Sequence, residues 1–359
     1  MNKVILIAAI MLLLITPVRA EPAEIIDTDA LENAVPEYVT DILGSDEVSS
    51  ASDVDGLGNR IIAALKDELQ RSYKPAISRG IAIVLIAAIC SVLDIFGDES
   101  SPFYIKICAC TAVSLVCSGE LNSFFALGGN AVNALSDFAN ALLPTLCAAG
   151  VICGTPLAAA AKYAASMLFI DILITVASDI ILPLIYAYTA AVIASAAFGS
   201  KALSSVCGFM KWLCTSLMIA LTLTFVVYIS ISSAIASGGD AVATKVTKTA
   251  ISMSLPVVGG IISDAASAVI ASAELMRNLV GVFGLFVVLA ICLSPFIVIG
   301  LNCLVLKASA AIVKTFDGNG VSSLIGDLSS AYGMLLALTG SAGLMVFISV
   351  ISCIKAVGS

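Results

Sequence analysis

The chain contains no histidine, and only 12% of its residues are charged, against about 25% in a typical soluble domain. The absence of histidine excludes histidine-based general-base catalysis, histidine-ligated zinc and the usual pH switch. The shortage of charge extends over 359 residues, of which 60% are hydrophobic. No basic stripe that could neutralise nucleic-acid phosphates is present. The composition therefore predicts an integral membrane protein that contacts the lipid bilayer and binds no nucleic acid.

The usual catalytic motifs are also missing. The chain has no Gly-Lys-Ser or Gly-Lys-Thr of a P-loop, no metalloprotease His-Glu-x-x-His, and no Gly-x-Ser-x-Gly elbow at a strand-to-helix turn. Its 11 cysteines all lie at or after Cys90, inside apolar stretches, where we expect them to pack as small hydrophobic residues. We therefore predict no enzyme activity, no catalytic residue, no cofactor and no metal site.

Residues 1–20 have the pattern of a secretory signal peptide. Lys3 supplies the positive charge, Val4 to Ile15 form an apolar core of 12 residues, and Val18-Arg19-Ala20 is similar to a cleavage site. The apolar core is too short to span about 30 Å of hydrocarbon comfortably. An uncleaved anchor is the alternative. Both interpretations place the following residues outside the cytoplasm.

Residues 21–79 are predicted to form a small acidic extracytoplasmic region. This stretch holds 13 of the 25 acidic residues and 5 of the 17 basic residues. Apolar side chains recur every four residues near its end, which predicts an amphipathic helix over 57–73. We expect this helix to lie on the membrane or to meet a partner, with a solvated spacer helix as the alternative. The residues of the repeating stripe are Leu57, Ile61, Leu65, Leu69 and Tyr73.

The remainder predicts an all-α, polytopic transmembrane helical bundle. A transmembrane hairpin is expected over 80–121, followed by two tandem copies of a membrane repeat, 122–236 and 237–359. The sequence GGNAV at Gly128 recurs as GGDAV at Gly238, an offset of 110 residues, and Leu-Pro or Ser-Pro pairs recur at an offset of 112. From the lengths of the apolar runs we expect about six to nine spans after the signal peptide.

Glycines and prolines recur at matching places in the two copies. In membrane proteins, apolar segments interrupted in this way point to the functional centre, and small residues allow helices to pack closely. We therefore predict a packing and helix-break motif. Its residues are Pro144, Pro183, Pro256, Gly259, Gly260 and Pro295.

Three aspartates lie within apolar segments, namely Asp171, Asp179 and Asp264. Ionisable residues at membrane depth are costly and often functional, so these are the candidate intramembrane polar sites, with Lys106 and Lys162 as partners. Ion coupling in a transporter is one interpretation, and structural pairing is another. An intramembrane aspartyl protease would also need two aspartates, but the flanking sequences carry none of its motifs.

The stretch from 255 to 295 resembles the stage III sporulation protein AE family of endospore-forming bacteria. The residues that carry the resemblance are Pro256-Val257-Val258-Gly259, Asp264-Ala265, Ala271-Ser272-Ala273, Asn278, Val280-Gly281, Gly284 and Pro295. It continues more weakly over most of the chain.

The resemblance implies a function that composition alone does not give. Members of that family belong to a set of stage III sporulation A proteins made in the mother cell, which act with a forespore membrane partner. Together they are expected to form a channel-like or secretion-like complex between the two cells that supports forespore development. The resemblance implies a non-enzymatic, permease-like subunit in the mother-cell membrane around the forespore. The alternative is an autonomous secondary transporter or permease coupled through the intramembrane aspartates.

Overall fold

The structure, a computed structural model, describes residues 28–44, 47–96, 101–153, 156–254, 259–316 and 320–355, and all regular structure in these ranges is helical. Short helices come first, and long helices follow. The short ones are α2 (Asp29–Glu32), α3 (Glu37–Leu43) and the 3₁₀-helix η2 (Val48–Ser52); the long ones are α4 (Val54–Phe96), α5 (Ser101–Ile152), α6 (Pro156–Val176), the π-helical turn η3 (Ala177–Ile181), α7 (Leu182–Phe198), α8 (Lys201–Ser254), α9 (Gly259–Val313) and α10 (Val321–Lys355).

Within the ranges that the structure describes, six helical stretches are long and apolar enough to cross a membrane. They lie in α4, in α5, in the continuous α6–η3–α7 rod, and in α8, α9 and α10. The predicted all-α, polytopic membrane fold is therefore confirmed, at the lower end of the predicted number of spans. A shorter apolar stretch, Phe103–Cys117, forms the first part of α5.

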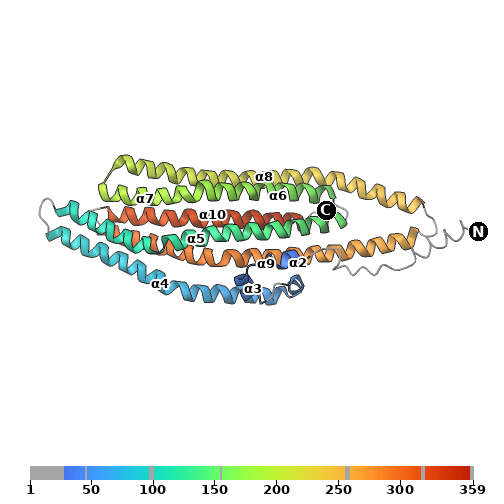
Figure 1. Cartoon of the computed structure of the whole chain (residues 1–359), viewed down its shortest axis with the longest axis horizontal. Helices are drawn as coiled ribbons and strands as arrows, with labels where there is room; N and C mark the ends of the chain where they lie inside the picture. The colour runs from blue at the N-terminus through green and yellow to red at the C-terminus, as the bar shows by residue number, and fades with distance from the viewer. Residues whose placement is uncertain are drawn as a thin grey trace, which may run out of the picture.

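The long helices lie side by side and alternate in direction along the chain (Figure 1). α4 lies at one edge of the bundle, and α6 and α8 lie at the opposite edge, with α5, α9 and α10 between them (Figure 1). The last part of α8 and the first part of α9 project together beyond one end of the bundle (Figure 1). Gly199, with a φ of 65°, makes the tight turn between α7 and α8 that only a glycine adopts easily.

At two of the prolines where helix breaks were predicted, the helix is continuous. α5 continues through Pro144 and α9 continues through Pro295. A proline inside a helix removes one backbone hydrogen bond, but neighbouring helices and local adjustments compensate for this within a membrane. Pro183 is the second residue of α7, two residues after the π-turn η3 ends, so the helix there changes geometry without ending. Pro256 lies outside the described residues.

Helix boundaries also differ from the predicted segments. The expected amphipathic helix over 57–73 and the first span form the single helix α4, which contains Pro75. The predicted boundary at 121/122 falls inside α5, and the boundary at 236/237 falls inside α8. The signal peptide over 1–20 lies outside the described residues. The two-copy organisation remains a prediction.

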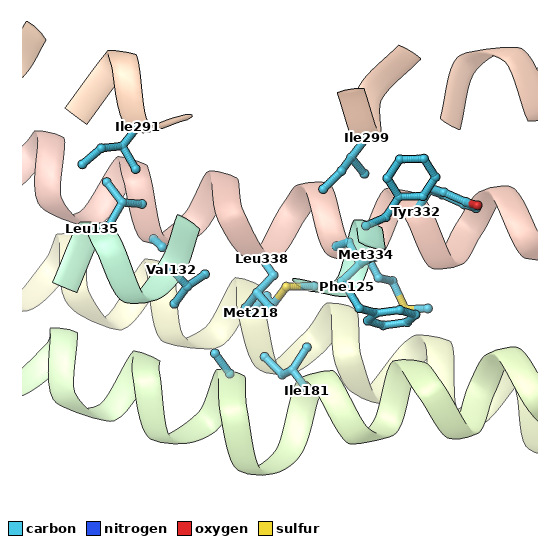
Figure 2. Close-up of a cluster of buried hydrophobic side chains, with 14 of the residues drawn as sticks. Phe125, Val132, Leu135, Ile181, Met218, Ile291, Ile299, Tyr332, Met334 and Leu338 are labelled. Carbon is cyan, nitrogen blue, oxygen red and sulfur yellow. The ribbon is translucent and has the colours of Figure 1, made fainter. Parts of the chain in front are cut away.

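The centre of the bundle is filled with apolar side chains from five helical segments (Figure 2). At least five of these side chains expose no more than 1% of their surface: Leu135, Ile181, Ile291, Ile299 and Leu338. Aromatic rings add to the packing, and those of Phe125 and Tyr186 stack with their centroids 3.7 Å apart. Around these side chains, the described residues therefore enclose a solid core and not an open pore.

Charge is absent from matching stretches of three helices. Lys211 and Asp240 enclose 28 uncharged residues of α8, Arg277 and Lys307 enclose 29 of α9, and Asp327 and Lys355 enclose 27 of α10. We call these stretches (212–239, 278–306 and 328–354) the uncharged band. At 1.5 Å per residue the band is about 40 Å long, which matches a bilayer with its headgroups.

Side-chain contacts show that these stretches lie level with one another. At one end Lys211 donates a hydrogen bond of 2.9 Å to Ser330, and Cys303 contacts Ser329. At the other end Arg277 donates to the carbonyl oxygen of Ile354. The three stretches of the uncharged band therefore lie level with one another in the bundle.

Candidate functional site

Among the described residues, the one ion pair lies where four helices meet. Arg79 of α4 contacts Glu120 of α5 at 2.7 Å and donates a hydrogen bond of 2.6 Å to the Oδ1 atom of Asn302 of α9. Its guanidinium lies 5.6 Å from the centroid of the Phe124 ring, which packs edge-on against Tyr332 of α10. A rigid guanidinium can serve several partners at once, so Arg79 ties together the helices near one edge of the uncharged band.

Close approach of α4 and α9 supports this cluster. A Cβ atom on Gly80 would lie 2.5 Å from Cγ1 of Val305, which no real Cβ tolerates. Ser309 donates a hydrogen bond of 3.4 Å to the carbonyl oxygen of Gly80. Glycine therefore allows the backbones to approach and places Arg79 within reach of Asn302.

A cavity of about 730 Å³ lies between the first half of α4 and helices α3, α5 and α9. α4 contributes the charged side chains Arg60, Asp67, Glu68 and Arg71, while α9 contributes Ser294 and Pro295 from within the uncharged band. Tyr38, another lining residue, is 44% exposed, and the partial burial of its side chain raises its pKa to about 12. A cavity lined by charged side chains thus lies beside the middle of the uncharged band of α9.

Polar residues continue this surface along α5. Asn130, Asn133, Asp137 and Asn140 are all exposed and recur every three or four residues, which places them on one face of the helix. Phe125 of the same helix stacks on Tyr186, and Tyr188, one half-turn further along α7, donates to the carbonyl oxygen of Asp327 at the edge of the uncharged band. α5 runs in the same direction as α10 (Figure 1), so the polar residues that follow Phe125 lie within the band. We call the α4 charges at the cavity and this α5 row the hydrophilic flank.

Asp171 and Asp179 lie elsewhere, on the outer surface of the α6–η3 rod. Both side chains are exposed, and neither forms a hydrogen bond or ion pair with the part of the chain that the structure describes. Their neighbours Leu168, Ile172 and Ile180 are exposed apolar side chains. The two aspartates therefore do not share an internal cavity. A carboxylate facing lipid there would cost about 2.5–3.5 kcal/mol.

Comparison with known proteins decides the family. The family model described as stage III sporulation protein AE matches residues 35–357. The chain belongs to this family. It is also 22% identical to the stage III sporulation protein AE of Bacillus subtilis (strain 168) over 278 residues, which cover 76% of this chain and 70% of that protein. No solved structure matches the chain. The family resemblance predicted from the sequence is thus confirmed, and the chain is a sporulation membrane protein of the stage III AE family.

Lys162, one of the two lysines expected to pair with the aspartates, has a different partner. Lys162 is buried and donates a hydrogen bond of 2.6 Å to the carbonyl oxygen of Ser352. Arg277, also buried, donates to the carbonyl oxygen of Ile354. The last four carbonyl groups of a helix lack intrahelical partners and carry partial negative charge. Two buried cations therefore cap the end of α10.

The remaining candidates belong to the stretch that carries the family resemblance. α9 begins at Gly259 and contains Gly260 and Asp264, but the contacts of Asp264 lie outside the described residues. Within the ranges that the structure describes, no group of acidic and cysteine residues could hold a metal ion.

Sequence reasoning missed the most connected polar residues of the family member. Arg79 and Glu120 lie at almost equal distances from the turn that joins α4 and α5, and this symmetry would have predicted their pairing. Arg277 lies directly before Asn278, one of the residues that carry the resemblance, but its sequence context gives no sign that it caps α10.

Proposed function

We propose that this chain is a non-enzymatic, multi-pass subunit of a channel complex in the mother-cell membrane around the forespore. Its partners are the other stage III sporulation A proteins and a forespore membrane protein, and the complex supports forespore development. Family membership supports the sporulation context. The observation that carries the channel role is the hydrophilic flank, which lies at the level of the uncharged band.

The filled interior supports a passage outside the single chain. Val132, Leu135 and Leu338 are buried in the apolar centre of the bundle (Figure 2). The hydrophilic flank cannot face lipid, because its charged and amide groups would be left there without hydrogen-bond partners. The flank therefore lines an aqueous passage that neighbouring subunits complete.

Thiol labelling tests this function. Asn133→Cys and Asn140→Cys, on the hydrophilic flank, are expected to react with a membrane-impermeant thiol reagent in membranes from sporulating cells. Ile219→Cys and Leu223→Cys are matched controls, because both native side chains are more than half exposed on the apolar surface of α8. These controls are expected to stay at the background of the parent chain, since the reagent does not enter lipid. Labelling at Asn133 no greater than at Leu223 would contradict an aqueous flank.

The secondary-transporter alternative makes a different prediction. Ion coupling requires carboxylates in a site that both substrate and water reach, whereas Asp171 and Asp179 lie on the outer surface. The purified chain in proteoliposomes is expected to show no solute uptake without its partners. Uptake that disappears in the Asp171→Asn or Asp179→Asn variant would favour the transporter and contradict a subunit role.

A further inference from the structure

The outer face of α6 and η3 carries carboxylates among apolar side chains, and lipid does not solvate the carboxylates. Asp171, Thr175 and Asp179 are exposed polar side chains along one line, and exposed Leu168 and Ile172 flank them. In a regular α-helix, residues eight apart differ by about 80° around the axis. The wider π-turn η3, with hydrogen bonds from i to i+5, brings the two aspartates closer to one face.

The opposite edge of the bundle has a complementary face on α4. Lys66 and Lys74 are exposed, are eight residues apart, and form no ion pair within the part of the chain that the structure describes. The apolar side chains Leu65, Leu69 and Tyr73 beside them are 46%, 43% and 38% exposed. The α6–η3 face therefore carries two carboxylates and the α4 face two ammonium groups, each among apolar side chains, while exposed Asp67 lies at the border of the α4 face with the cavity.

The printed contacts fix the relative level of the two faces. Arg79 of α4 donates to Asn302, whose neighbour Cys303 contacts Ser329 of α10, and Arg79 also lies beside Tyr332. Tyr188 of α7 donates to the carbonyl oxygen of Asp327 of α10. Because α7 runs opposite to α10, Arg79 lies level with about residues 183–186 of α7.

The same register, followed along α4 from Arg79 toward its N-terminus, places the two lysines level with the two aspartates. Lys74, five residues earlier, lies level with about residues 178–181, which include Asp179. Lys66, thirteen residues earlier, lies level with about residues 170–173, which include Asp171. α4 and the α6–α7 rod run in the same direction (Figure 1), so both pairs match in the same order.

We propose that two copies of this chain associate side by side in the membrane, with Lys66 and Lys74 of one copy against Asp171 and Asp179 of the next. The two faces lie at opposite edges of the bundle (Figure 1), so the contact is heterologous. Heterologous contacts repeat from copy to copy and form rings when the rotation closes. Each copy then supplies cations at the depth where the next copy exposes carboxylates, and the apolar neighbours of both faces become buried.

Disulfide cross-linking between two differently tagged full-length copies tests this contact. Gln70→Cys in one copy and Thr175→Cys in the other introduce thiols at exposed positions that the register places at one level. In oxidised membrane vesicles without other sporulation proteins, a mixed dimer above the background of the parent chain is expected. The control pairs Gln70→Cys with Ala190→Cys, which is exposed on the same rod about 22 Å further along, and is expected to give no dimer above that background.

Charge reversal identifies the contact. Lys66→Glu with Lys74→Glu in the Gln70→Cys copy is expected to remove most of the mixed dimer. Adding Asp171→Lys with Asp179→Lys to the Thr175→Cys copy is expected to restore it. A missing dimer with the unreversed copies, equal cross-linking through Ala190→Cys, or a failure of the second reversal to restore the dimer would each overturn the proposal. Because these vesicles lack the partner proteins, a failure here leaves the thiol-labelling test of the channel role unaffected.

Discussion

Arg79→Ala is expected to destabilise the folded chain by about 2–4 kcal/mol, because three interactions disappear together. Glu120 loses its ion-pair partner, the buried Asn302 side chain loses its donor, and the Phe124 ring loses the cation beside it. Asn302 contributes most of this cost, since its amide oxygen is left without a donor between packed helices. The measurement is the thermal unfolding midpoint of the detergent-solubilised chain, together with its level in membranes.

Two further variants separate the contribution of the Arg79–Glu120 ion pair to stability from that of the shape of the Arg79 guanidinium. Glu120→Gln is expected to cost less than about 1 kcal/mol, because the Glu120 side chain is 44% exposed and its ion pair is screened. Arg79→Lys is expected to fall between the two, since an ammonium on a flexible stem cannot reproduce the guanidinium fork. Lys314→Ala, at an exposed lysine, is the neutral control. An Arg79→Ala chain as stable as Lys314→Ala would show that the cluster does not hold the helices together.

Lys162→Met is expected to loosen the last turn of α10. The side chain is 2% exposed and donates to the carbonyl oxygen of Ser352, so its removal leaves a buried acceptor at the negative end of the helix. A buried cation at a helix C-terminus contributes up to about 2 kcal/mol. Amide hydrogen exchange in a peptide covering 345–355 is therefore expected to speed up by as much as about thirtyfold, with little change near the start of α10.

Arg277 allows a matched comparison with Lys162, because both side chains donate to carbonyl oxygens at the end of α10. Its Nε and Nη1 groups have no partner in the described part of the chain, whereas another of its nitrogens caps Ile354. Arg277→Lys is expected to keep the cap without those unpartnered groups, and therefore to change exchange less than Arg277→Met. Equal exchange at 345–355 in the parent chain, Lys162→Met and Arg277→Met would contradict the capping role.

The sequence predicted the fold class because that depends on patterns that are local along the chain. Runs of 27 or more uncharged residues in α8, α9 and α10 leave few alternatives to membrane-spanning helices. The predicted helix breaks at Pro144 and Pro295 were wrong, because the low helix propensity of proline is measured for a helix alone in water. In the bundle, neighbouring helices stabilise the helix on either side of each proline.

The polar sites could not be predicted in the same way, because each joins segments far apart in sequence. Lys162 meets Ser352 across 190 residues, and Arg79 meets Asn302 across 223. The aspartates on α6 and η3 were found because a charge inside an apolar run is visible locally. Their outward position depends on how α6 packs against α5, α8 and α10, and no local pattern reports that packing.

The six candidate spans alternate in direction, and their even number decides on which side of the membrane the two ends of the helical bundle lie. An even number of crossings returns the chain to the compartment from which it started, so the start of α4 and the end of α10 lie at the same end of the bundle (Figure 1). The projecting hairpin of α8 and α9 lies at this end as well. One compartment therefore receives all three of these segments, and a protein anchored in an opposing membrane could contact them without any part of it crossing the bilayer.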